Sequence, residues 1–406
     1  MKDKIVILFI YGGGIRGIIP TRLIDHIERK TGYPITDLVD VFSGPSTGAI
    51  INSAMNIPDP HAPDKPRYRA KHIVRFYEQE GEKIFPLDRS RAFRGLIHDF
   101  NNRTMKLSQL NYLLRHGHYN PRNLYRPLKK LYGPTKLSES LKSLVIPAYN
   151  IDGEQITLAS EADESEDSPV RTKNNFIDEG GHALWLKNIK FPDAIRIRSP
   201  QNVTLLDSVM ASTAAPTYFP CYHFSTLDEP ESQIHYSGID GSIFDNPCIS
   251  YLGAISPHLP DDKDVVFIAL GTGYTHKSIT KDEWNKLGSL GVVDPVNDLP
   301  LINILFHASE SALLESFEAE ITNNNLFVFN KSMNKLDSPD HAPSPEIDVA
   351  TPENLKRLEN FTNLILEEQE KQIDALCHTL VSLKNKREIN NKSRSFFNNI
   401  SKLFKP

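Results

Sequence analysis

The fold is decided by the stretch KIVILFIYGGGIRG, residues 4–17. The apolar, largely β-branched run Ile5–Ile10 is typical of a central parallel strand that is covered on both faces. After the glycines, apolar residues recur at three- and four-residue steps from Ile18 to Ile27, which predicts a helix. A second strand is predicted over residues 38–42 and a helix of small residues over 47–55. This alternation of strands and helices predicts a parallel sheet.

The segment Gly44-Pro45-Ser46-Thr47-Gly48 lies between the second strand and the second helix. It has the pattern G-x-S-x-G of a nucleophile elbow, in which glycines allow a tight turn and the serine projects at the carboxyl end of a strand. The free N–H groups of the following helix favour negative charge on a reacting oxygen. The pattern is common, however, and a glycine-bounded turn with Ser46 as a helix cap is the alternative.

The segment Gly12-Gly13-Gly14-Ile15-Arg16-Gly17 follows the first strand and opens the first helix. It fits the pattern G-x-G-x-x-G of dinucleotide-binding proteins, and Asp37 or Asp40 lies where such proteins place an acid for the ribose. Alternatively, its backbone N–H groups form an oxyanion hole for Ser46. Both interpretations rest on unpaired backbone donors that face an anion.

A third segment, Asp240-Gly241-Ser242, follows a predicted strand over residues 234–239. An acid at a strand end is a candidate general base, but it also commonly caps a turn. Fourteen histidines leave a serine–histidine–aspartate triad possible by count, yet none lies in a signature, including His26, His223 and His235 near the motifs. Because the sequence has no H-E-x-x-H or C-x-x-C pattern, it predicts neither a metal nor a cofactor.

Together the three segments resemble the patatin-like phospholipase family, whose pattern is D-G-G-G-x-R-G, then G-x-S-x-G, then D-G-G or D-G-A. The stretch Ala211–Pro220 and the strand end Leu270–Gly273 are similar to the family as well. The sequence departs from the pattern at Tyr11, where the family usually has Asp, and at Ser242, where it has Gly or Ala. The resemblance covers most of the chain and leaves out residues 384–406.

The resemblance implies a lipid acyl hydrolase, phospholipase A-like or lysophospholipase-like, that cleaves phospholipids or other acyl lipids. Ser46 would attack the ester carbonyl to form an acyl-enzyme intermediate, and Asp240 would take the serine proton. The N–H groups of residues 12–14 would bind the oxyanion, and Arg16 would brace that loop. Because free Asp is a weak base with a pKa near 3.9, we expect either that burial raises the pKa of Asp240 or that the oxyanion hole supplies most of the rate.

Composition excludes several other classes of protein. The 406 residues carry a net charge of −5, which gives no indication of nucleic-acid binding. Three widely spaced cysteines exclude a disulfide scaffold and fit a reducing compartment. No apolar run reaches the roughly 18 residues that span a bilayer. We therefore expect a cytoplasmic protein that can contact a membrane from one side; export to another cell is left open.

We expect one α/β domain over residues 1–383, with three layers, a mostly parallel central sheet and helices on both faces. Residues 56–145 are predicted to be a helical insertion near the active-site mouth, beginning with a surface loop over 56–70. Residues 160–174 are predicted to be an acidic loop. Long helices are predicted over residues 301–321 and 352–383.

Residues 384–406 are predicted to be a separate basic, amphipathic tail with a net charge of +6. Its apolar residues recur at helical spacing and are Phe396, Phe397, Ile400, Leu403 and Phe404. The pattern indicates transient contact of residues 394–405 with a lipid surface. A helix docked on the domain, or a frayed chain end, is the alternative.

Two other functions remain open at this point. A catalytically silent member of the family could bind a membrane or a protein partner, and the departures from the family pattern at Tyr11 and Ser242 are compatible with this hypothesis. A dinucleotide-binding protein could use the loop at residues 12–17. An activating protein partner is compatible with the sequence, which gives no indication of its nature.

Overall fold

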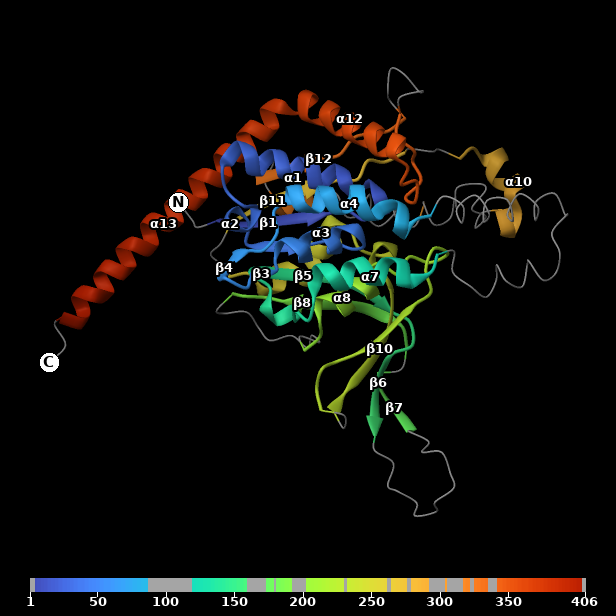
Figure 1. Cartoon of the computed structure of the whole chain (residues 1–406), viewed down its shortest axis with the longest axis horizontal. Helices are drawn as coiled ribbons and strands as arrows, with labels where there is room; N and C mark the ends of the chain where they lie inside the picture. The colour runs from blue at the N-terminus through green and yellow to red at the C-terminus, as the bar shows by residue number, and fades with distance from the viewer. Residues whose placement is uncertain are drawn as a thin grey trace, which may run out of the picture.

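Figure 1 shows the computed structural model of the whole chain. The structure describes residues 4–86, 119–158, 173–178, 180–191, 202–229, 232–260, 264–275, 279–291, 304, 317–321, 325–334 and 342–403. The predicted acidic loop, apart from its last two residues, lies outside these ranges, as do most of the predicted helix over 301–321 and the middle of the predicted insertion.

Ten strands of the described residues form one mixed sheet. Their bounds are β1 (Lys4–Ile10), β2 (Val41–Ser43), β5 (Ser143–Asn150), β6 (Glu154–Leu158), β7 (Lys173–Asp178), β8 (His182–Asn188), β9 (Tyr222–Ser225), β10 (Ile234–Asp240), β11 (Asp264–Leu270) and β12 (Leu326–Phe329). The order is β12-β11-β1-β2-β5-β10-β6-β7, with β8 on β5 and β9 on β10. The five strands from β12 to β5 are parallel, and the others join antiparallel.

Helices cover both faces of this sheet (Figure 1). The helices include η1 (Gly14–Gly17), α1 (Ile18–Thr31), α2 (Ile35–Leu38), α3 (Thr47–Met55), α4 (Ala70–Ile84), α7 (Pro121–Tyr132), α8 (Leu205–Ser212), η4 (Gly241–Ile243), α9 (Pro247–Ile249), η5 (Ser250–Ile255), α12 (Pro352–Glu368) and α13 (Glu370–Leu403).

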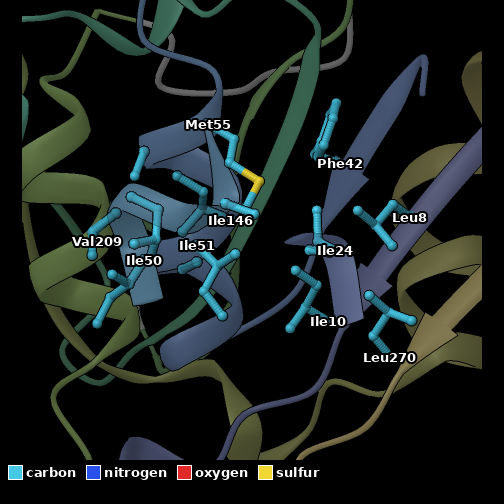
Figure 2. Close-up of a cluster of buried hydrophobic side chains, with 14 of the residues drawn as sticks. Leu8, Ile10, Ile24, Phe42, Ile50, Ile51, Met55, Ile146, Val209 and Leu270 are labelled. Carbon is cyan, nitrogen blue, oxygen red and sulfur yellow. The ribbon is translucent and has the colours of Figure 1, made fainter. Parts of the chain in front are cut away.

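Strand β1 shows why the molecule has three layers. Its even-numbered residues from Val6 to Ile10 belong to the larger apolar cluster, under α1, α3, α4 and α8. Its odd-numbered residues from Ile5 to Phe9 belong to a second cluster, which includes side chains of α9 and η5. Figure 2 shows part of the larger cluster, where side chains from β1, β2 and β5 meet those of α1, α3 and α8. The predicted three-layer architecture with parallel central strands is confirmed, and the antiparallel extension is an addition to it.

Two local predictions differ from the structure. The surface loop predicted over 56–70 contains a hairpin of β3 (Pro58–Asp59) and β4 (Ala62–Pro66). The helix predicted over 352–383 is divided into α12 and α13 at Gln369, whose backbone leaves the helical region (φ −109°, ψ 19°). The Gln369 side chain donates to the carbonyl of Val328 on β12 at 3.3 Å, so a contact distant in sequence accompanies the break.

Helix α4 belongs to the main helical layer. It packs against α1 and η1, and its buried residues from Ala70 to Ile84 belong to the larger apolar cluster. Helix α7 also contributes buried leucines to that cluster. The described parts of residues 56–145 are therefore built into the domain core.

Helix α13 continues through residue 383 without a break and is fixed to the sheet just beyond it. The Arg387 guanidinium donates to both carboxylate oxygens of Asp40, at 2.6 and 3.0 Å, and to the carbonyl of Lys4 at 2.8 Å. Asp40 also accepts the N–H of Val6 at 2.8 Å. Lys4 and Asp40 lie at the amino ends of β1 and β2, and beyond them α13 extends away from the domain (Figure 1).

None of the helices in the described residues combines the length and the apolar composition that crossing a bilayer requires.

The contact between Arg387 and Asp40 gives a prediction about stability. Arg387→Gln should lower the free energy of unfolding by about 1–2 kcal/mol, because it breaks a bidentate, partly buried ion pair that joins α13 to two strands. Arg357→Gln is the matched control, since Arg357 pairs with Glu353 on the exposed surface of α12; it should change the free energy by less than about 0.5 kcal/mol. Urea denaturation measures both, and equal effects would contradict the anchoring role.

Candidate active site

Ser46 lies on a strained turn between β2 and α3. Its backbone has φ 56° and ψ −122°, a conformation that costs a non-glycine residue on the order of 1–3 kcal/mol. Its N–H donates to the carbonyl and the hydroxyl oxygen of Ser212, at 3.2 and 3.1 Å, which helps to hold the turn. Although Ser46 is at the N-terminal position of α3, its side chain makes no capping hydrogen bond. The helix-cap alternative is therefore wrong, and the hydroxyl is left for another role.

The two glycines of the elbow let it approach the end of β1. A Cβ atom at Gly44, where φ is +146°, or at Gly48 would lie 2.1 Å from the carbonyl oxygen of Ile10. Real Cβ contacts are never so short, so both positions require glycine for close approach.

Asp240 ends β10 and faces Ser46 from the neighbouring part of the sheet. Its carboxylate accepts a hydrogen bond from the N–H of Ser242 at 2.8 Å, and the Ser46 hydroxyl lies close enough to lower the pKa of the carboxyl group. The Asp240 N–H donates to the carbonyl of Ala214 at 3.0 Å. Asp240 therefore caps the η4 turn, which begins with Gly241, and contacts the candidate nucleophile as well.

Burial gives Asp240 the protonation behaviour of a base. Only 3% of the residue is exposed, and burial raises the pKa of Asp240 to about 6, against the hydrogen bonds from Ser242 and Ser46, which lower it. The rise expected from the sequence is confirmed. A carboxylate with a pKa close to neutral pH is ionised there and still basic enough to accept a proton in a transition state.

The histidines near the motifs lie elsewhere. His223 and His235 stack on each other, with ring centroids 5.8 Å apart, on the paired strands β9 and β10. His235 precedes Asp240 by five residues on the strand, which separates their Cα atoms by roughly 16 Å. His26 lies within α1. None of the three contacts Ser46 in a way that a triad would require.

The glycine loop lies beside Ser46. A Cβ atom added at Gly12 would be 3.3 Å from the Cβ of Ser46 and 2.2 Å from the Ser242 hydroxyl oxygen. Thr272 donates to the Gly12 carbonyl at 2.8 Å, and the Ile347 carbonyl accepts the N–H of Ile15 at 2.8 Å, so the loop is held from both sides. Within the described part of the chain, the N–H groups of Gly12, Gly13 and Gly14 donate to no protein acceptor. Unpaired donors next to a nucleophile have the arrangement of an oxyanion hole.

Arg16 supports this loop from η1, the short helix that ends at Gly17. Its Nη1 lies 4.0 Å from the sulfur of Met333, and its Nε has no hydrogen-bond partner among the described residues. Removal from water lowers the pKa of Arg16 to about 10, so the guanidinium stays charged at neutral pH. Its contacts are consistent with bracing the loop.

The two departures from the family pattern leave this arrangement in place. Tyr11 extends the pairing of β1, since its N–H donates to the Leu270 carbonyl at 3.1 Å, and its ring packs edge-on against Phe9. The Ser242 hydroxyl oxygen is buried near the Asp240 carboxylate, close enough to lower the Asp240 pKa slightly but short of hydrogen-bond geometry with any described group.

An apolar cavity opens on Ser46. It has about 40 Å³ of free volume, and aromatic side chains provide much of its wall, namely Phe76, Tyr77, Phe85, Tyr218 and Phe219. No histidine, acid or lysine is among its described lining residues. The cavity offers hydrocarbon contact next to a candidate nucleophile, as an acyl chain requires.

The surroundings of Asp40 do not fit the dinucleotide interpretation, in which this residue would bind a ribose. Asp40 lies at the amino end of β2, whereas the glycine loop lies at the carboxyl end of β1, and these strands are parallel. The Asp40 carboxylate is occupied by Arg387 and by the N–H of Val6. A ribose bound near the loop would not reach it. Among the described residues, no group of three or more potential ligands could hold a metal ion.

Sequence reasoning missed the residues that hold the site from a distance. Ser212 and Thr272 lie in stretches that resemble the family, but the sequence did not indicate that they fix the backbone of Ser46 and Gly12. Ile347, which clamps the loop through its carbonyl, has no signal in the sequence.

The geometry and the sequence comparisons lead to the same group of proteins. The sequence model of the family "Patatin-like phospholipase" matches residues 8–252, a range that includes the glycine loop, Ser46 and Asp240. The chain belongs to the patatin-like phospholipase family. This family membership supports hydrolysis of acyl esters in lipids as the class of activity.

Individual relatives are distant. The chain is 24% identical to Patatin-like protein 1 of Arabidopsis thaliana over 393 residues, which cover 91% of this chain and 83% of the relative. It is 24% identical to Patatin-T5 of Solanum tuberosum, over 71% of this chain and 66% of the relative. Among solved structures, VipD from Legionella pneumophila aligns with 90% of this chain and 67% of its own at 14% identity, with a TM-score of 0.28.

The raised pKa of Asp240 also affects stability. Between about pH 4 and pH 6 the folded protein holds a proton that the unfolded chain has already lost. The free energy of unfolding therefore falls as the pH rises through this window, and above it the cost of the buried charge reaches about 3 kcal/mol.

Asp240→Asn should remove this cost. We expect the variant to be more stable than the native protein at pH 8, and its advantage to be about 1.5 kcal/mol smaller at pH 5. Ser46→Ala is the control, because it keeps the buried carboxyl group and should still lose stability as the pH rises. Urea denaturation at the two pH values measures the difference; an advantage of Asp240→Asn that does not change with pH would contradict the raised pKa.

Proposed function

We propose that this protein is a serine esterase of the phospholipase A type, with Ser46 as nucleophile and Asp240 as general base. The observation that carries the proposal is the position of the Ser46 hydroxyl, on a strained turn, beside the buried carboxylate of Asp240. A base that contacts the nucleophile directly needs no intervening histidine.

The reaction would proceed in two halves. The Ser46 oxygen attacks the ester carbonyl while its proton passes to Asp240, and the oxyanion that forms is stabilised by the N–H groups of Gly12–Gly14. When the C–O bond of the ester breaks, Asp240 returns the proton to the leaving alcohol. Water then attacks the acyl-serine with Asp240 again as base, which releases the fatty acid and restores Ser46.

The catalytically silent alternative would require the departures at Tyr11 or Ser242 to displace a reacting group. Tyr11 instead continues the pairing of β1 with β11, and with Ser242 present the Ser46 hydroxyl still lies beside the Asp240 carboxylate. These contacts favour an active enzyme.

Two substitutions and a pH profile test this proposal. Ser46→Ala and Asp240→Asn should each lower fatty-acid release from a phospholipid by at least about a thousandfold, because each removes a reacting group. In the native protein kcat/KM should rise with pH to a plateau, with an apparent pKa near 6 set by Asp240.

The matched control is His235→Ala, which alters the nearest histidine on the same strand and should keep the native pH profile. A fluorophosphonate ester should label Ser46 in the native protein. Full activity in Ser46→Ala, or loss of the pH-dependent limb in a single histidine variant, would overturn the proposed dyad.

We also propose that residues 394–405 contact an anionic membrane surface. Four of the seven basic residues of the tail, Lys392, Arg394, Lys402 and Lys405, follow the contact between Arg387 and Asp40 in sequence. Because α13 is fixed at the amino ends of the strands, this contact would tether the protein without placing the membrane at the mouth of the site.

The tether can be tested with vesicles. Replacing Phe396 and Phe397 together by Ser should weaken co-sedimentation with phosphatidylserine-containing vesicles by at least about tenfold, because burial of each ring contributes roughly 1.5–3 kcal/mol. Leu364→Ser, which removes an exposed apolar side chain from α12, is the control and should bind normally. Unchanged binding of the double variant would contradict the proposed membrane contact of residues 394–405.

A further inference from the structure

A second apolar cavity lies beside the cavity that opens on Ser46. Its free volume is about 200 Å³, compared with about 40 Å³ for the first cavity. It is formed by the start of α7, by Met210 of α8 and by the segment from Thr213 to Tyr222. For comparison, an apolar cavity of about 150 Å³ in another protein holds a six-carbon ring. The second cavity therefore has room for a hydrocarbon segment of at least that size.

The two cavities share three lining side chains. Leu124, Thr213 and Phe219 line both cavities, and all three are buried. The Phe219 ring is fixed on the other side by the rings of Tyr119 and Phe85, with centroids 5.9 and 6.2 Å away. A closed partition at these three residues would keep an acyl chain bound in the first cavity from continuing into the second.

The segment that forms this partition also holds both candidate catalytic residues. The carbonyl of Ser212 accepts the N–H of Ser46, and the carbonyl of Ala214 accepts the N–H of Asp240. Five residues further on, the same segment places Phe219 between the two cavities. The second cavity is thus held in a fixed relation to the nucleophile.

The second cavity has its own route to solvent. Arg122, Pro220 and Cys221 line it and are exposed, so an apolar chain can enter without crossing the partition. A lipid with two acyl chains presents two adjacent hydrocarbon chains, of which only one is attached to the ester under attack.

We propose that the second cavity binds the uncleaved acyl chain of a two-chain glycerolipid, while the first carbons of the chain to be released, next to the scissile ester, lie in the first cavity. This inference rests on the proposed function, and it makes diacyl lipids better substrates than their monoacyl counterparts. Binding of the uncleaved chain would contribute hydrophobic free energy and orient the scissile ester at Ser46.

Cys221 allows the second cavity to be filled in the native protein. It is exposed, whereas Cys248 and Cys377 are buried. An alkyl methanethiosulfonate reacts with the Cys221 thiolate to form an alkyl disulfide and release methanesulfinate, and dithiothreitol reverses the change. The decyl reagent would place a hydrocarbon chain at the cavity, and the methyl reagent would add almost no volume.

We expect the decyl reagent to lower hydrolysis of a diacyl phosphatidylcholine at least tenfold and hydrolysis of the matching lysophosphatidylcholine less than twofold. The methyl reagent should leave the ratio of the two rates unchanged, and dithiothreitol should restore it. In Cys221→Ser the decyl reagent should no longer change this ratio. Equal loss with both lipids, or no loss with either, would overturn the proposal. If the decyl reagent shifted the preference among monoacyl lipids toward shorter acyl chains, the two cavities would form one continuous channel. This result would also overturn the proposal.

Binding separates this inference from the proposed function. In Ser46→Ala, decylation of Cys221 should weaken binding of a non-hydrolysable dialkyl ether phospholipid at least tenfold and spare the monoalkyl ether. If the native protein hydrolyses neither ester but this difference in binding is found, the proposed catalysis is refuted and binding of an acyl chain in the second cavity is supported. If the native protein is active but the ethers respond equally, the catalysis stands and the second cavity is refuted.

Discussion

The close approach of the nucleophile turn to the carbonyl oxygen of Ile10 is the constraint on which the site depends. Gly44 and Gly48 flank Ser46, and neither could carry a side chain without colliding with that oxygen. Because the turn lies directly on the end of β1, Ser46 comes beside the glycine loop that continues the same strand. The parallel pairing of β1 with β2 therefore brings two motifs, separated by about thirty residues of sequence, to one edge of the sheet.

The antiparallel half of the sheet supplies the proposed base. Strand β10 pairs with β5, which itself pairs with β2, so Asp240 reaches the serine across one intervening strand. Burial there makes Asp240 a stronger base and also makes its charge costly to the folded state. The strained backbone of Ser46 adds to that cost. Both costs fall on the two residues proposed to react, and their N–H groups donate to carbonyl groups of the Ser212–Ala214 segment, which helps to hold them in place.

The sequence predicted the parts of this structure that depend on neighbouring residues. The apolar run of β1, the glycine loop, the elbow and Asp240 are local patterns with local physical causes. The contact of Ile347 could not be predicted, because a backbone hydrogen bond to a carbonyl group places no demand on side-chain type. The contact of Ser212 with Ser46 joins residues 166 positions apart, so only the folded chain shows it. The break at Gln369 could not be predicted either, since neither Gly nor Pro marks it and periodicity continues across it. Likewise, the sequence indicates only that Arg387 is one charge of a basic tail, whereas its position opposite Asp40 follows only from the folded chain.

The position of Arg387 constrains how this enzyme could use a membrane. Its partners, Asp40 and the carbonyl of Lys4, lie at the amino ends of parallel strands whose carboxyl ends hold the site. A strand of seven residues spans roughly 23 Å, so a lipid surface bound near the anchor would not meet Ser46 at the same time. A helix extending about 24 Å beyond Arg387 can instead concentrate the enzyme near a membrane while leaving the site free to turn toward it. Recognition of the substrate must then come from the cavities beside Ser46, because the tail is attached at the wrong end of the sheet to present it.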